Sequence, residues 1–240
     1  MRISELSAKS GVAIPTIKYY LREGMLHQGE QTAATRAEYD ETHLRRLRLI
    51  RALLEVGRLS VASIKTVVAA VEDESLPTHQ MLGTAHYALS PAVEPEPGEE
   101  WQAARAEVDA LIESLGWDIT PAAPTRDELA QTLVRMRQLG VPVDLTPYVE
   151  VARKLVSEVE MDLIPFHGPR DAAVEALVLG TVLYGRALDT LRRMAQESES
   201  ARRLSPAREG QSRPFARRIR TARTVVAPRH SSAPAGEMRA

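Results

Sequence analysis

The sequence predicts a mainly α-helical protein, in which an N-terminal head of short helices with a small β wing precedes a C-terminal helical bundle. Three observations support this fold class. A glycine separates two short helical segments near the N-terminus, apolar residues recur at spacings of three and four over most of the chain, and one polar stretch, residues 27–39, interrupts that pattern. A chain of 240 residues is long enough for two small domains.

The head begins with two short helices. The first is expected over Ser4–Ser10 and ends at Gly11, because glycine adopts the left-handed conformation at low cost. The second is expected over Pro15–Glu23, since the N–H that Pro15 lacks has no partner in a first turn. Two short helices joined by a glycine turn indicate a helix-turn-helix.

The rest of the head should contain the wing and two further helices. Residues 27–39 lack helical periodicity and are predicted to form a loop or a β-hairpin. Asp40 and Ser60 each precede an apolar periodic run that they can cap. The head, residues 1–72, is followed by a junction, residues 73–100, that contains a short helix over Thr78–Leu89 and a linker rich in proline and glutamate.

The second unit, residues 101–201, is predicted to be a helical bundle. Its first helix has a heptad seam that favours either a dimer interface or packing within the bundle. Thr125 and Glu128 have capping-box spacing and open a helix that Gly140 ends. Another helix should run over Pro147–Leu163. The seam residues are Trp101, Ala104, Val108, Leu111 and Leu115.

The last helix, from about Pro169 to Glu199, is apolar over most of its circumference between Ala172 and Leu191, which is typical of the central helix of a bundle. Glu175, Arg186 and Asp189 interrupt this run, so a membrane span is not expected. Glycines within it favour either a ligand cavity or close helix packing. The chain also has no cysteine and no apparent export signal, and we expect a cytoplasmic protein without disulfides or thiolate sites.

Charge is distributed unevenly along the chain, although the net charge is −1. Residues 1–70 have eleven Lys/Arg against seven Asp/Glu, residues 71–201 have ten against twenty-three, and residues 202–240 have ten arginines against two glutamates. The basic head can therefore bind the phosphates of a nucleic acid, although the net charge of the whole chain is close to zero. The tail, residues 202–240, is expected to be disordered and to serve either as a phosphate-binding tether or as a solubilising extension.

The helix over Pro15–Glu23 has the residues of a DNA recognition helix. Ile17 and Leu21 would hold it against the core, while its N-terminal half enters a major groove. The alternative is a small amphipathic helix whose charges are merely solvated. The residues expected to contact bases or the DNA backbone are Thr16, Lys18, Tyr19, Tyr20 and Arg22.

The stretch "RISELSAKSGVAIPTIKYYLREGML", the wing-like loop and "EYDETHLRRLRLIRALLEVGRLSVASI" together resemble the DNA-binding head of MerR-family transcription regulators, over about residues 1–71. The resemblance implies a winged helix-turn-helix with Arg36 and Tyr39 as wing contacts. The sequence departs from the family pattern in three places. Ala13 and Ile14 replace a small polar cap, Arg36 lies one residue further from Tyr39 than usual, and an extra residue near Arg58 lengthens one turn.

The resemblance implies a homodimer that binds a pseudo-palindromic operator within a long promoter spacer and distorts it, so that RNA polymerase can engage the promoter. The expected partners are thus double-stranded promoter DNA, RNA polymerase and a second copy of the chain. The alternative function is an architectural, nucleoid-type DNA-binding protein without a ligand response. In many members a long helix after the head forms the dimer, but here the proline-rich linker takes its place. The sequence therefore does not identify the helices that form the dimer.

A small organic ligand is the candidate signal for the bundle, residues 101–201, although the sequence does not show that a signal exists. The run "LVLGTVLYGRALDTLRRMA" loosely resembles the C-terminal bundle of TetR-type regulators, in which such helices form a ligand pocket and a dimer interface, but no ligand-binding residue can be named. No metal site and no cofactor are expected: His79 and His86, seven residues apart, are more typical of polar surface residues than of ligands. Nucleotide-binding, hydrolase and metalloprotease motifs are absent, so an enzyme is not expected.

Overall fold

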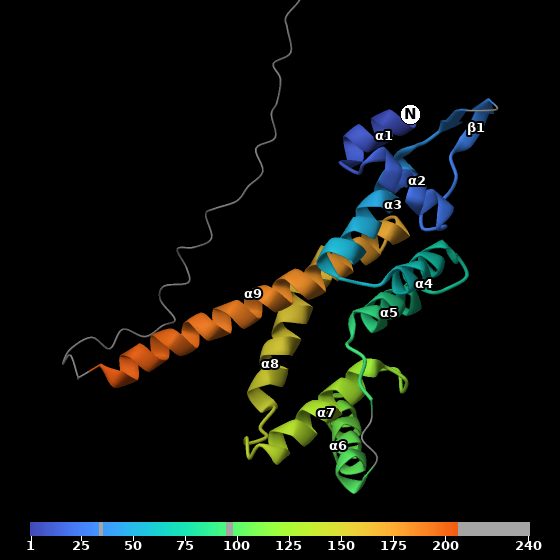
Figure 1. The fold of residues 1–240 in the computed structure, drawn as a ribbon. Helices are drawn as coiled ribbons and strands as arrows, with labels where there is room; N and C mark the ends of the chain where they lie inside the picture. Colours follow the sequence, from blue (N-terminus) through green and yellow to red (C-terminus); the bar gives the residue numbers. More distant parts are fainter. Residues whose placement is uncertain (34–35, 95–97, 206–240) are drawn as a thin grey trace, which may run out of the picture. The chain divides into compact units, whose positions relative to one another are not determined.

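The structure, a computed structural model, describes residues 1–33, 36–94 and 98–205, and in this part of the chain it is mainly α-helical with one small hairpin, as predicted (Figure 1). The chain divides into two compact units, Met1–Leu191 and Arg192–Ala240. The elements in order are α1 (Ile3–Ser10), α2 (Ile14–Arg22), β1 (Glu30–Ala33), β2 (Arg36–Glu38), α3 (Glu41–Arg51), the π-helical turn η1 (Ala52–Val56), α4 (Val61–Glu72), α5 (Thr78–Leu89), α6 (Glu99–Leu115), α7 (Pro124–Gln138), α8 (Thr146–Leu155), the π-helical turn η2 (Val156–Glu160), the 3-10 turn η3 (Met161–Leu163) and α9 (Arg170–Leu204).

The helix-turn-helix forms where the sequence predicts it. Gly11 ends α1 in the left-handed conformation, with φ of 70°, and its N–H donates to the Ser7 carbonyl at 2.9 Å. Ala13 takes the N-cap position of α2 without a side-chain cap, which is the missing polar cap that the sequence indicated. Leu6 and Ile17 are fully buried and join both helices to one core.

The wing is an antiparallel hairpin that leaves the head between α2 and α3 (Figure 1). Glu30 lies opposite Glu38, and Gln31 lies opposite Ala37. A Cβ atom at Gly29 would lie 2.6 Å from the Glu38 carbonyl oxygen, so the base of the hairpin needs a glycine there. The sequence-based prediction of a hairpin is confirmed.

The caps predicted for α3 and α4 are also confirmed. The Asp40 carboxylate accepts from the N–H groups of Thr42 at 2.9 Å and His43 at 3.3 Å, and the Ser60 hydroxyl accepts from the Ser63 N–H at 3.1 Å. In the turn before α4, Arg58 takes the left-handed conformation with φ of 57°.

The core of the head also includes α5 and the first two turns of α9. Met81 and Ala85 of α5, and Val174 and Val178 of α9, are buried in the same cluster as Leu6. The Arg170 guanidinium, at the start of α9, binds the C-terminal end of α4 and the turn after it. It donates to the carbonyl oxygens of Ala70, Val71, Asp73 and Leu76 at 2.9–3.0 Å.

This packing corrects the prediction that α9 is the central helix of a bundle. Its buried side chains end at Val178, and the following apolar residues, Leu183, Tyr184, Leu188 and Leu191, are 45–61% exposed. The apolar run is thus covered by the head at one end and open over the following turns. In the unit that begins at Arg192, the Glu199 carboxylate forms ion pairs with Arg202 and Arg203 of the same helix at 2.6 and 2.7 Å.

Helices α6 and α7 form a pair with a separate small core. Ala104 and Val108 of the heptad seam pack against Ala130, Leu133 and Val134, so these two seam residues serve packing within the chain. The predicted capping box at Thr125 is wrong: α7 starts one residue earlier, at Pro124, with Ala123 as the N-cap. Within the described residues, no helix is long and apolar enough to cross a membrane.

Candidate nucleic-acid interface

Helix α2 presents a polar face away from the core of the head. Ile17 is fully buried and Tyr20 is 7% exposed, so both anchor the helix. Lys18 and Arg22 are exposed, and Thr16 and Tyr19 are half-buried. Because positions 17 and 20 face inward at a helical spacing of three, positions 16, 18, 19 and 22 are left at or near the surface. An α-helix with an exposed cationic face has the size and charge to enter a DNA major groove.

Tyr19 and Arg22 form a local pair on this face. The guanidinium carbon of Arg22 lies 5.3 Å from the centre of the Tyr19 ring, within the range of a cation–π contact. The neighbouring Glu23 accepts a hydrogen bond from Lys65 of α4 at 3.0 Å, which is the main cause that lowers the pKa of its carboxyl group. The other carboxylate oxygen of Glu23 lies 3.7 Å from Arg22 Nε, so Glu23 pairs with both Lys65 and Arg22.

Tyr20 differs from its neighbour because its ring lies in the core. Burial raises the pKa of the Tyr20 phenol, and the charge of Glu55 raises it further. Glu55 in turn holds Arg51 through two hydrogen bonds of 2.8 and 3.0 Å, and Arg51 donates to the Ser10 carbonyl at 3.3 Å. Arg51 and Glu55 thus stabilise the C-terminal end of α1, and the buried Tyr20 ring packs α2 against the core of the head.

The two residues expected as wing contacts lie in different surroundings. Arg36 begins β2, but its side chain lies outside the described residues. Tyr39 follows β2 and is buried, with its ring edge-on to His43 at a centroid distance of 5.1 Å. Its backbone N–H donates to the Met1 carbonyl at 2.8 Å and ties the end of the wing to the start of the chain.

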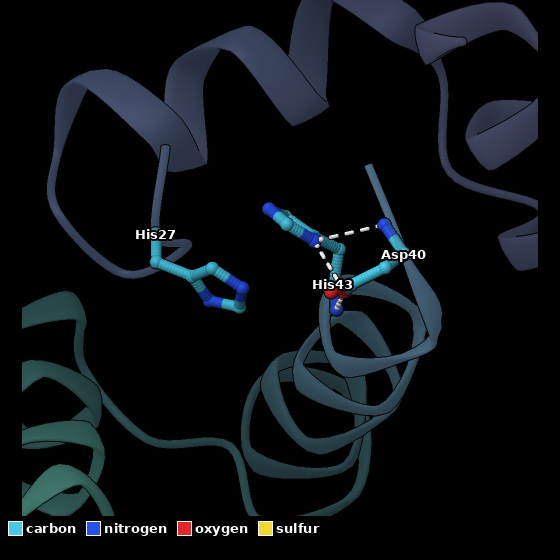
Figure 2. Close-up of side chains that lie close together, drawn as sticks. All are labelled: His27, Asp40 and His43. Atoms are coloured by element: carbon cyan, nitrogen blue, oxygen red, sulfur yellow. Dashed lines mark hydrogen bonds and ion pairs between the residues drawn. The ribbon is translucent and has the colours of Figure 1, made fainter. Parts of the chain in front are cut away.

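A histidine cluster at the base of the wing was not found from the sequence. The rings of His27 and His43 face one another with centroids 3.8 Å apart, and the Asp40 carboxylate lies 2.8 Å from His43 Nδ1 (Figure 2). Burial lowers the pKa of His27, and the nearby His43 and Arg46 lower it further. His27 lies before the hairpin, and Asp40 and His43 lie after it. Because a hairpin brings its two ends together, these positions in the sequence could have indicated the cluster.

A hollow of about 660 Å³ lies beside α6, α7 and α8. Leu111, Leu133 and Val149 contribute apolar walls, while Glu107, Glu150 and Arg153 provide charges. A site with apolar walls and a few charged groups is typical of small-molecule pockets. The sequence-based analysis named no residues for such a pocket, because the loop between α7 and α8 that helps to form it has no distinctive pattern.

Comparison with known proteins gives two similarities. Residues 1–71 match the family described as MerR HTH family regulatory proteins. Among solved structures, the chain is similar to SCO5550 from Streptomyces coelicolor A3(2), a proposed transcriptional regulator, at 40% sequence identity and a TM-score of 0.68, with 86% of this chain and 99% of that chain covered. No curated protein matches the chain.

Proposed function

This chain belongs to the MerR family of helix-turn-helix regulatory proteins and is a DNA-binding transcription regulator; from that premise we propose that it acts as a homodimer on a pseudo-palindromic promoter operator. The observation that carries the proposal is the polar face of α2, where Lys18 and Arg22 are exposed above the buried anchors Ile17 and Tyr20. The dimer would alter transcription by distorting the DNA, so that RNA polymerase at the promoter gains or loses its alignment.

We assign different roles to the residues of this face. Thr16 and Lys18, in the N-terminal half of α2, would meet base edges or phosphates in the major groove. Tyr19 and Arg22 would contact the DNA backbone together, since each holds the other in place. Arg36 of the wing would contact backbone beside the groove. Burial favours an orienting role for Tyr20 and Tyr39, which support α2 and the wing.

The open apolar face of α9 supports the homodimer. Tyr184, Leu188 and Leu191 follow one another at spacings of four and three, and each is 45–61% exposed. Exposed large apolar residues in a continuous helical stripe are expected to be covered by a partner. A second copy of the same helix is the occupant that a two-fold operator requires, because two heads must reach two half-sites.

The hollow beside α6, α7 and α8 supports a small organic ligand as the signal. Its volume of about 660 Å³ falls in the range of small-molecule sites, and its walls are mainly aliphatic. A ligand there would need an apolar body and a polar group to pair with the charged residues at the rim. The alternative, an architectural nucleoid protein, would need no such pocket. Of the arginine-rich tail, residues 202–240, α9 includes residues up to Leu204, and residues 206–240 lie outside the described residues.

The experiment is genome-wide immunoprecipitation with sequencing, followed by footprinting on the enriched DNA. We expect peaks at a few promoters, with an inverted repeat in a long spacer, and Lys18→Ala should bind this DNA about tenfold more weakly with a shallower salt dependence. Lys154→Ala, which removes an exposed lysine of α8, is the matched control. Uniform coating of DNA would favour the architectural alternative, and unchanged affinity of Lys18→Ala would refute the recognition-helix assignment.

A further inference from the structure

We propose that His27, Asp40 and His43 form a binding site for a divalent transition-metal cation of the Zn²⁺, Ni²⁺ or Co²⁺ class at the base of the wing. The three groups come from the loop after α2, the N-cap of α3 and the first turn of α3. Each offers one ligand atom, and these atoms lie within 4.8 Å of one another. The His43 ring lies between the His27 ring and the Asp40 carboxylate (Figure 2).

The strongest argument is the contact between His43 and Asp40. The His43 side chain is 4% exposed, and its Nδ1 accepts a hydrogen bond from the Asp40 backbone N–H at 3.1 Å. The Asp40 carboxylate lies 2.8 Å from the same Nδ1. When Nδ1 accepts from the N–H group, it faces the carboxylate as a second acceptor, and a cation bound between the two would satisfy both.

His27 supplies the second imidazole. Its Nε2 is hydrogen-bonded to the exposed hydroxyl of Thr42 at 2.9 Å, a bond that a water molecule can replace. Around a tetrahedral ion with bonds of about 2.0–2.1 Å, ligand atoms lie roughly 3.3 Å apart. The three ligand atoms lie within 4.8 Å of one another, so they must approach by no more than about 1.5 Å. The His27 ring, whose centroid lies 3.8 Å from that of His43, must turn its Nε2 toward the ion to make this approach.

The ligand set determines the class of ion. Two imidazoles and one carboxylate favour Zn²⁺, Ni²⁺ or Co²⁺, whereas Mg²⁺ and Ca²⁺ require mainly oxygen ligands. The nearby cation is Arg46, but its guanidinium is bound to Glu72 at 2.7 Å, which offsets its repulsion of a metal ion. The chain has no cysteine, so thiolate sites for soft metals are excluded.

Metal binding would close the base of the wing. His27 lies before β1, and Asp40 and His43 lie after β2, so one ion would join both ends of the hairpin. A wing fixed at its base has fewer conformations to lose on contact with DNA, which raises affinity. This effect rests on the proposed DNA-binding function, whereas metal binding by the cluster does not.

The test uses the untagged, metal-free full chain with Co²⁺ as a spectroscopic probe and Zn²⁺ as the competitor. We expect one Co²⁺ per chain with visible ligand-field absorption, displacement by Zn²⁺, and a melting temperature that rises with Zn²⁺ concentration. His27→Ala should keep the metal-free melting temperature but bind at least about tenfold more weakly. His43→Gln should lose binding as well, and His79→Ala, which removes an exposed histidine of α5, is the matched control.

Two outcomes would overturn the site. One is a wild-type chain whose absorption and melting temperature do not respond to either metal. The other is equal binding by the wild type and His27→Ala, or loss of binding in His79→Ala, which would place the metal elsewhere. Operator affinity is then measured with and without Zn²⁺, so that a metal-bound chain without DNA binding counts against the proposed function and not against the metal site.

Discussion

Replacing Arg170 by alanine should weaken the docking of α9 on the head. The guanidinium donates four hydrogen bonds of 2.9–3.0 Å to carbonyl oxygens at the end of α4 and in the following turn. Carbonyls at the end of a helix have no partner within the helix, and they carry its partial negative charge. Arg170 therefore satisfies these acceptors and neutralises the C-terminal end of α4 at the same time.

The magnitude follows from these bonds. A hydrogen bond to a charged group contributes about 1.5–3 kcal/mol, but four bonds from one side chain do not add fully, and water can reach part of the site. We expect a loss of about 3 kcal/mol, which corresponds to roughly a hundredfold shift in the docking equilibrium. If docking and unfolding are coupled, the melting temperature should fall by about 6–12 °C.

The assay combines thermal unfolding with hydrogen exchange. Amide protons in the last turn of α4, including the Asp73 N–H that donates to the Ala69 carbonyl at 3.0 Å, should exchange faster in Arg170→Ala. Arg170→Lys should be intermediate, because one ammonium group cannot hold four carbonyls in a planar fork. Arg153→Ala, which removes an exposed arginine of α8, is the control. Unchanged melting and unchanged exchange in Arg170→Ala would refute the reasoning.

Two further predictions concern α9. Leu188→Glu places a charge on the open apolar face, so sedimentation should give a monomer with a similar circular dichroism spectrum, whereas Arg186→Gln on the opposite face should leave the dimer intact; a dimeric Leu188→Glu would contradict the proposed interface. Burial raises the pKa of Glu175, so its ionisation costs stability as the pH rises through that pKa. Glu175→Gln should therefore be more stable than wild type at pH 7, and the difference should vanish below about pH 4; equal denaturation midpoints at pH 7 would argue against it.

Features with a local cause could be predicted from the sequence. Gly11, Asp40 and Ser60 stand where the predicted helices end or begin, because a left-handed residue or a capping oxygen acts on its immediate neighbours. The burial of Tyr20 was not predicted: Leu21 was expected beside Ile17 in the core and Tyr20 on the DNA, because spacings of three and of four both place a residue on the inward side of a helix. At the start of α7, the sequence offers both a capping box at Thr125 and a proline at position 124. The helix begins at Pro124, so Thr125 lies inside the helix and cannot cap it.

Features that depend on distant partners could not be predicted. Periodicity indicates that a helix has an apolar face, but not which element covers it. Arg170 lies about a hundred residues from the carbonyls that it binds, as the separations of 94–100 positions show. His27 and His43 meet only because the hairpin closes between them. The sequence-based search for metal ligands considered His79 and His86 on one helix and therefore passed over ligands on separate elements.

Helix α9 makes two kinds of contact that would link the proposed dimer partner to the head. Its first two turns are part of the head, through Val174 and Arg170, while Tyr184 to Leu191 remain open to a partner. A rigid helix transmits a change at one end to the other, because its backbone hydrogen bonds resist bending. If the exposed apolar face of α9 pairs with a second copy, this contact would fix the position of the head, because the first turns of α9 pack on the head. Because α4 receives Arg170 at its C-terminal end and binds Glu23 at the end of α2 through Lys65, this series of contacts ends at α2, the proposed recognition helix.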